Sequence, residues 1–252
     1  MFEHFKGEEV FVKKVLDYLD QVQYKQRLIL TQFLDPYHQS IVKSVIGHQD
    51  EVQVLENGGF IHSESQRIII APYFYEIEKE DFEIVVCKII YAKNFEKLTH
   101  RDILGALMSL GIKRELFGDI VEKDKGFYLA VDRHIYEYLK DHLSMIKRSK
   151  VKFVEWDEEI EVKNDYLVKS FIVSSFRLDK IMSSFYKISR QKAAEFIRAG
   201  HVKVNHKPVE QINYLCNNKD IISFKKHGRV MFVDCNKQTR SDNYVVEGYF
   251  YK

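Results

Sequence analysis

Proline, glycine and cysteine are all scarce in this sequence. Three prolines and 11 glycines in 252 residues exclude a collagen-like chain and a low-complexity, disordered one. Nearly half of the residues (45%) are hydrophobic, which is enough to form packed cores in two or three domains. Phenylalanine and tyrosine are plentiful (18 and 15), and we expect most of them in β-sheet cores.

The three cysteines, Cys87, Cys216 and Cys235, are too few and too widely spaced for a disulfide framework or for the close ligand pairs of a zinc site. The chain also lacks any apolar run of about 18 residues, the length that a membrane-spanning helix needs. Residues 1–6 do not have the apolar core of a signal peptide. We therefore expect a soluble cytoplasmic protein that does not contact membranes.

The motifs of common enzyme classes are missing as well. There is no G-x-G-x-x-G or G-x-x-x-x-G-K-[ST] loop for a nucleotide, no H-E-x-x-H for a metal and no G-x-S-x-G nucleophile elbow. His134 and His142 lie eight residues apart on one predicted helix, too far to share an ion without other ligands. Asp102 and Asp119 lie outside any recognisable catalytic context, so we expect capping or structural roles for them. We predict no catalytic residue, cofactor, metal or small-molecule substrate.

Charge is divided unevenly along the chain. Residues 177–252 hold 15 Lys and Arg against 7 Asp and Glu, a formal charge of +8. Residues 1–176 hold 24 against 30, a formal charge of −6. The net charge of +2 therefore hides two oppositely charged parts, and the basic part is predicted to bind a polyanion.

We expect an α+β protein whose first block, residues 1–75, is a mixed α/β domain. Apolar residues at helical spacing predict helices over 10–19, over 28–34 and, beyond the break at Asp35-Pro36, over 36–46. Asn57-Gly58-Gly59 is typical of a tight turn between a strand at 52–55 and a return strand. Residues 67–71 are predicted to be a further buried strand.

The second block, residues 76–155, has the order βαββαβ of ferredoxin-like, RRM-like domains. The predicted strands are 82–91, 119–122, 127–131 and 150–156, and the predicted helices are 101–110 and 133–145. Thr99 is expected to cap the first helix and Gly111 to end it. The aromatic strand signature of a standard RNA-recognition motif is missing from 127–131, so this block is interpreted either as an RNA-binding domain or as a protein-docking scaffold.

An acidic run, Glu155 to Glu161, predicts a solvated linker over 156–175. The third block, 176–252, then begins with two short amphipathic helices, the second capped by Ser189 and ended by Gly200. Strands are predicted around 202–205, 221–224, 230–233 and 244–251.

Two helices folded onto this small sheet are expected to collect cationic side chains on one rim, where they would hold phosphates. The amides at the helix start beside Ser189 add partial positive charge. The candidate RNA-binding residues are Arg177, Lys180, Ser189, Arg190, Lys192, Arg198, Lys203, Asn205 and Lys207, with Lys226 and Arg229 in a second basic turn.

The third block carries a fixed set of residues, namely Arg177-Leu178-Asp179, Ser189-Arg190, Lys192-Ala193, Ile197, Gly200, Val202, Val204-Asn205 and Lys207. In these positions it resembles the S4 RNA-binding domain, also called the alpha-L motif. With Phe33-Leu34-Asp35-Pro36-Tyr37, and with the stretches 99–105 and 117–120, the whole chain resembles YlmH-type proteins, in which such a domain follows two N-terminal domains.

This resemblance implies a non-enzymatic RNA-binding factor that associates with the ribosome. It suggests action on the large subunit, in stalled or obstructed complexes that hold peptidyl-tRNA, with rRNA as a partner and contact with tRNA left open. The family has also carried a cell-division label. Three departures stand out: Asn205-His206-Lys207 for the usual Asn-Gly-Lys, Lys219-Asp220 for Gly-Asp, and Thr239-Arg240-Ser241-Asp242 for a basic turn. The first two are expected to alter turn geometry only, whereas the third removes positive charge.

Two alternatives remain open at this point. Similar domains are appended to pseudouridine synthases and rRNA methyltransferases, so residues 76–155 could house an RNA-modifying activity. The acidic N-terminal part could instead make the protein a docking adaptor linked to cell division, touching RNA only at Lys113-Arg114.

Overall fold

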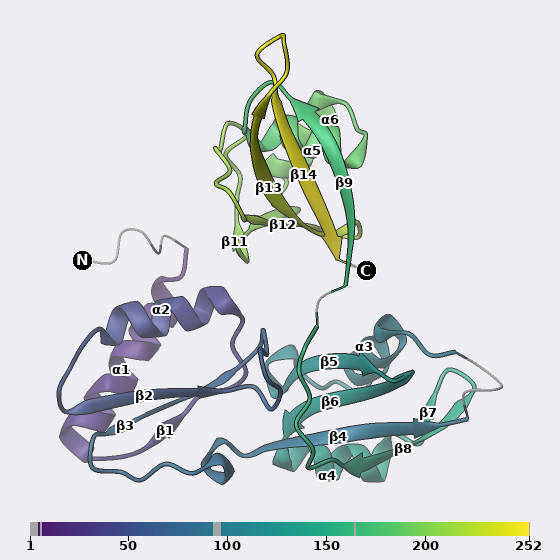
Figure 1. The fold of residues 1–252 in the computed structure, drawn as a ribbon. Coiled ribbons are helices and arrows are strands. Elements are labelled where there is room, and N and C mark those ends of the chain that lie inside the picture. The colour runs from purple at the N-terminus through teal and green to yellow at the C-terminus, as the bar shows by residue number, and fades with distance from the viewer. Residues whose placement is uncertain (1–4, 6, 93–96, 164, 252) are drawn as a thin grey trace. The chain divides into compact units, whose positions relative to one another are not determined.

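A computed structural model describes residues 5, 7–92, 97–163 and 165–251. The chain forms two compact units, unit 1 over Met1–Val162 and unit 2 over Lys163–Lys252 (Figure 1). Both units combine helices with antiparallel sheets, which confirms the α+β class. No helix in the described part of the chain is long and apolar enough to cross a membrane.

Unit 1 begins with two helices packed on a three-stranded sheet of order β1-β3-β2 (Figure 1). The helices are α1 (Glu9–Lys25) and α2 (Pro36–Ile46), and the strands are β1 (Ile29–Leu30), β2 (Val52–Asn57) and β3 (Arg67–Pro72). The Asp35 carboxylate caps α2 by accepting from the His38 amide at 2.9 Å, with Pro36 in the first turn as predicted. The helix predicted over 28–34 is wrong. Ile29 and Leu30 pair with β3, because burial of this apolar segment in the sheet outweighs its helical spacing.

The tight turn predicted at Asn57-Gly58-Gly59 is also wrong. Strand β2 pairs directly with β3 from Asn57 opposite Arg67, and residues 58–66 form a long loop between them. Gly59 has φ +85°, and a Cβ there would meet the side chains of Ile84 and Val86 at 3.0 Å. The glycine pair therefore serves close packing of this loop on the next sheet, not a hairpin.

The second part of unit 1 is a five-stranded antiparallel sheet of order β5-β6-β4-β8-β7, covered on one face by α3 and α4 (Figure 1). Its elements are β4 (Ile84–Tyr91), α3 (His100–Ser109), β5 (Phe117–Lys123), β6 (Gly126–Asp132), α4 (Arg133–His142), β7 (Met145–Ile146) and β8 (Ser149–Glu155). This order is compatible with the ferredoxin-like pattern, to which β7 adds an edge strand. Helix α4 ends at His142 instead of Met145, because the chain turns there into β7.

Polar contacts of Arg67 and Asp119 help to join the two parts of unit 1. The buried Arg67 side chain donates from Nε to the Thr31 carbonyl at 2.9 Å and from Nη1 to the Asp132 carboxylate at 3.0 Å. Burial lowers the pKa of Arg67, although Asp132 opposes this shift. The Asp119 carboxylate accepts from the amides of Glu64 (2.6 Å) and Ser65 (3.2 Å). Asp119 thus has the structural role that we expected, and Asp102 forms a capping box with Thr99.

Unit 2 has two helices on one face of a six-stranded sheet of order β11-β10-β12-β13-β14-β9 (Figure 1). Its elements are β9 (Tyr166–Val173), α5 (Leu178–Tyr186), α6 (Arg190–Arg198), β10 (Val202–Val204), β11 (Lys207–Pro208), β12 (Ile221–Phe224), β13 (Gly228–Gln238) and β14 (Tyr244–Tyr251). Fully buried Ile181, Met182, Ile197 and Phe232 lie in the core between the helices and the sheet.

The linker expected over 156–175 is mostly part of the two folded units. Ile160 is buried in unit 1, where its carbonyl accepts from the Ile61 amide at 2.9 Å. Residues 166–173 form β9, which pairs with β14 along its whole length. The sequence did not predict this, because the run of acidic side chains suggested a solvated linker. In the structure the apolar residues between the acids are buried, and the charged side chains remain in solvent.

Replacing Gly59 with alanine is predicted to lower the free energy of unfolding of unit 1 by about 2 kcal/mol, because the new Cβ meets both a positive φ and close neighbours. Gly105→Ala is the control, since Gly105 lies in α3 with open space around it and alanine favours a helix. Trp156, the only tryptophan, packs on Tyr128 in unit 1, so its fluorescence during denaturant unfolding reports this unit. Equal stabilities of the two variants would contradict the packing role of Gly59.

Candidate nucleic-acid interface

The start of α5 holds a carboxylate between two arginines. The Asp179 side chain is 3% exposed, whereas those of Arg177 and Arg190 are 36% and 56% exposed. Arg177 donates from Nε to Asp179 Oδ1 at 3.0 Å. Arg190 donates to Asp179 Oδ2 from Nε at 3.0 Å and from Nη2 at 2.7 Å. The buried anion therefore fixes two guanidinium groups that lie 13 residues apart in the sequence while leaving part of each in solvent.

The electrostatics of this site favour an ionised Asp179. Burial acts to raise the pKa of Asp179, but hydrogen bonds from Arg177 and Arg190 outweigh it, and the pKa is lowered. The position of the acid in the first turn of α5, near the positive end of the helix dipole, is also favourable. Arg177 and Arg190 carry two positive charges and Asp179 carries one negative charge, so the cluster presents a net positive charge to solvent.

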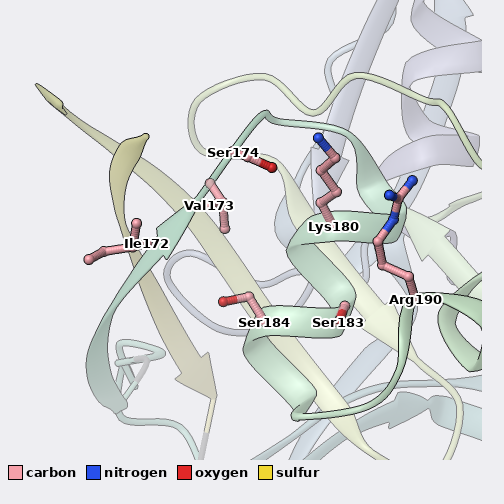
Figure 2. A pocket seen from close by; sticks show the side chains of 7 residues that line it. All are labelled: Ile172, Val173, Ser174, Lys180, Ser183, Ser184 and Arg190. Atoms are coloured by element: carbon pink, nitrogen blue, oxygen red, sulfur yellow. The ribbon is translucent and has the colours of Figure 1, made fainter. Parts of the chain in front are cut away.

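An open pocket of about 290 Å³ lies between β9, α5 and the start of α6. Its lining residues are Ile172, Val173, Ser174, Lys180, Ser183, Ser184 and Arg190. In Figure 2 the charged ends of Lys180 and Arg190 point the same way, whereas Ser184 points toward β9. The pocket therefore presents two cations and several hydroxyl groups, a combination that suits a phosphate more than an apolar ligand.

Helix α6 presents further candidate residues at its two ends. Ser189 caps the helix by accepting from the Lys192 amide at 3.2 Å, as predicted, and the Lys192 side chain is exposed. Arg198 is exposed as well, but it lies eight residues beyond Arg190, about 12 Å along the helix. Lys192 therefore lies in the same helical turn as Arg190, whereas Arg198 belongs to the opposite end of α6.

The β10–β11 hairpin uses Asn205 for its own structure. Asn205 and His206 have φ of 48° and 68°, the combination that a two-residue type I′ turn needs. The Asn205 carboxamide accepts from the Ile221 amide at 2.8 Å and donates to buried Asp220 at 2.7 Å. Turn geometry is thus retained without the usual glycine, and Lys207, half-buried beside the turn, is the more direct candidate for RNA contact.

The remaining candidates do not lie on one rim with the arginine pair, so that expectation holds only in part. Lys203 and Arg229 lie in one row of the sheet, each opposite Ser223, on the face away from the helices. The Arg229 guanidinium is 4.7 Å from the ring of Tyr251 on that face. Lys226 lies in the β12–β13 turn, which is tied to the end of α6 by a bond from the Lys225 amide to the His201 carbonyl. Strand alternation separates these groups, because a sheet has two faces.

Asp179 is the residue that our list of RNA-binding candidates missed. It was part of the matching pattern, but an acid does not suggest an RNA contact. A signal was present, since Asp179 adjoins the apolar stripe of Leu178, Ile181 and Met182 and a buried acid needs cationic partners. The hydroxyl groups of Ser183 and Ser184 in the pocket had no sequence signal.

Two features of the described residues bear on catalysis. These residues contain no group of three or more His, Cys, Asp or Glu side chains that could hold a metal ion. Burial raises the pKa of the Cys87 and Cys216 thiols to about 12, which makes both poor nucleophiles. The arrangement in unit 2 is suited to holding anions.

Fold and charge together define an S4-type nucleic-acid-binding domain that follows an α+β unit. Family models match three stretches: "YlmH, N-terminal" over residues 7–74, "Putative RNA-binding domain in YlmH" over 78–159, and the S4 domain over 176–222. These stretches lie close to the three blocks of the sequence.

Similarity to known proteins extends over nearly the whole chain. It is 32% identical to "Ribosome-associated protein quality control protein P2" of Bacillus subtilis over 255 residues, which cover 98% of this chain and 96% of that protein. A solved structure, "Cell division protein ylmH from Streptococcus pneumoniae", has 29% sequence identity and a TM-score of 0.53, and the match covers 62% of this chain and 96% of that one. The chain belongs to the YlmH family, with a C-terminal S4 domain.

Asp179→Asn is predicted to destabilise unit 2 by about 1–3 kcal/mol, because two guanidinium groups lose their anion. Since the folded-state pKa of Asp179 is depressed, its contribution is complete above the unfolded-state pKa of about 3.9 and is lost as pH falls through the folded-state pKa. Hydrogen exchange of the amides in 178–198 measures this stability.

The difference between wild type and Asp179→Asn should stay constant from about pH 5 to pH 8 and shrink below about pH 4. A difference that grows as the solution is acidified would show that Asp179 is not held as an anion.

Proposed function

We propose that this protein is a non-enzymatic RNA-binding factor of the cytoplasm that associates with the ribosome in protein quality control. The observation that carries the proposal is the arginine pair held by Asp179 beside Lys180, in a unit that carries most of the excess positive charge. The name of the Bacillus subtilis relative, which describes a ribosome-associated quality control protein, supports the cellular setting.

We expect the protein to recognise RNA mainly through contacts with its phosphate groups. Asp179 holds the arginine guanidinium groups in place before RNA binds, so less side-chain freedom is lost on binding than for two free arginines. Lys180 in the same pocket and Lys192 in the same helical turn as Arg190 add mobile charges, and the α6 amides contribute partial positive charge. Such a surface recognises the shape and backbone of a folded RNA more than its sequence.

We further propose that the RNA partner is rRNA of the large subunit, in stalled complexes that still hold peptidyl-tRNA. This finer assignment follows from the family resemblance. An RNA-modifying activity has no observation in its favour. The sequence lacks a glycine-rich cofactor loop, and the Asp102 and Asp119 carboxylates accept hydrogen bonds from backbone amides.

The test uses a double variant, Lys180→Glu with Lys192→Glu. Arg190→Glu is a poor choice, because it would place an acid against buried Asp179 and disturb the fold. In sucrose gradients of cell lysate, wild-type protein should run with large ribosomal subunits, and the double variant should remain near the top. Purified protein should lose RNA affinity steeply with salt, about a hundredfold or more between low and moderate ionic strength.

The matched control is Lys13→Glu with Lys25→Glu, which makes the same change in charge on exposed positions of α1 in unit 1. The control variant should still sediment with large subunits. If both variants run like wild type, or if both are lost alike, unit 2 does not bind the ribosome through the surface proposed.

A further inference from the structure

Three consecutive aromatic side chains are exposed in unit 1 directly after β3. Tyr73 is 66% exposed, Phe74 55% and Tyr75 38%. Their rings contact one another, since the ring centres of Tyr73 and Phe74 lie 5.7 Å apart and those of Phe74 and Tyr75 lie 5.5 Å apart. Large aromatic side chains that are exposed together are typical of a surface that binds a partner.

Hydrogen bonds hold the backbone of this aromatic segment in place. The Tyr73 amide donates to the Glu51 carbonyl at 3.0 Å, which extends the pairing of β3 with β2. The Gln53 side chain donates from Nε2 to the Tyr75 carbonyl at 2.6 Å. The Tyr75 hydroxyl group donates to the Gln26 carbonyl at 3.4 Å. Because the backbone is fixed, little conformational freedom is lost when a partner binds to the rings.

The surface around the rings is acidic. Residues 73–83 contain five acids and a single lysine, Lys79. Glu78 and Asp81 accept hydrogen bonds from backbone amides in a capping box. Further acids are exposed and form no ion pair among the described residues, namely Asp50 and Glu51 before β2 and Glu76 and Glu80 after β3.

The sign of this charge decides between classes of partner. RNA or an acidic protein would be repelled by the acids. A metal ion is disfavoured, because the described residues contain no group of three or more His, Cys, Asp or Glu side chains that could hold one. A guanidinium or ammonium group, in contrast, is attracted both to the acids and to the faces of the rings. The surface therefore suits a polypeptide whose positive charges are spread along its chain.

We propose that Tyr73, Phe74 and Tyr75, with Glu51 and Glu76, form an aromatic-acidic surface that binds an arginine-rich segment of another protein. Guanidinium groups would stack on the exposed rings, and the acids would pair with neighbouring positive charges. Basic arms of this kind are typical of proteins that bind nucleic acid. The inference goes beyond the proposed function and does not require unit 2 to bind RNA.

The test compares variants of the full chain that remove different parts of the aromatic-acidic surface. The ring variant, Tyr73→Ser with Phe74→Ser, removes two exposed rings but keeps Tyr75, whose hydroxyl group bonds to the backbone. The acid variant, Glu51→Gln with Glu76→Gln, removes two charges and keeps the size of the side chains. The matched controls change exposed positions in the second part of unit 1 and are Met108→Ser with Tyr138→Ser for the rings and Glu122→Gln with Asp141→Asn for the acids.

The probes are labelled peptides of repeating Arg-Gly-Ser, Lys-Gly-Ser and Glu-Gly-Ser, and binding is measured by fluorescence anisotropy. Wild-type protein should bind the arginine peptide more tightly than the lysine peptide and should not bind the glutamate peptide. The ring variant should bind the arginine peptide about fivefold more weakly and should lose the preference for arginine over lysine. The acid variant should bind both basic peptides about threefold more weakly, and each control should differ from wild type by less than about twofold.

Equal losses in a test variant and its control would overturn the proposal, because the peptide would then bind elsewhere on the chain. Tyr73→Phe with Phe74→Tyr keeps both rings and should bind the peptides like wild type, which guards against misfolding of the ring variant. A short unpaired RNA, measured with the same proteins, should bind equally to wild type and to the ring variant. An RNA affinity that falls in the ring variant would show that this surface binds RNA, and it would also overturn the proposal. The peptide measurements contain no RNA, so their outcome is independent of whether unit 2 binds the ribosome.

Discussion

A buried carboxylate between two arginines is the constraint on which the cationic surface of unit 2 depends. Asp179 is desolvated at the start of α5, so it must be neutralised, and Arg177 just before α5 and Arg190 at the start of α6 do this. The same contacts fix the direction of both guanidinium groups and join the two helix starts. The proposed RNA contact and the stability of unit 2 therefore share one set of residues, and a change in either arginine is expected to affect both.

The other cations of the molecule differ in how firmly they are held. Arg67 in unit 1 is buried against Asp132 and serves the fold alone. Lys180 and Lys192 in unit 2, like Lys150 and Lys152 in unit 1, form no ion pair among the described residues. Arginine is used where direction is fixed, and lysine where a mobile charge suffices, as the geometry of the two side chains favours. Residues 1–176 are acidic overall, yet they include a locally basic surface at Lys150 and Lys152.

Local signals in the sequence predicted the elements of the fold well. Asp35-Pro36 and Thr99 marked helix starts, and the apolar-rich stretches 82–91 and 127–131 marked strands that the structure confirms. Contacts between residues far apart in the chain could not be predicted from the sequence. The segment 28–34 has helical spacing, yet it joins a sheet, and Gly59 meets a surface about 25 residues further along the chain. The sequence predicted which residues belong to the basic surface but not how they are arranged. Strand register, and not charge, decides which face of the sheet Lys203 and Arg229 occupy.

The central claim is that the Asp179-organised surface contacts RNA on the ribosome, and lysine-reactivity mapping tests it directly. Purified protein, free and bound to large ribosomal subunits, would be acylated briefly, and the modification of each lysine would be measured by mass spectrometry. We predict strong protection of Lys180 and Lys192 in the complex, with Lys13 and Lys25 on α1 unchanged. Unchanged reactivity of Lys180 and Lys192 in a complex that has demonstrably formed would contradict the account, because the bound RNA would then lie elsewhere.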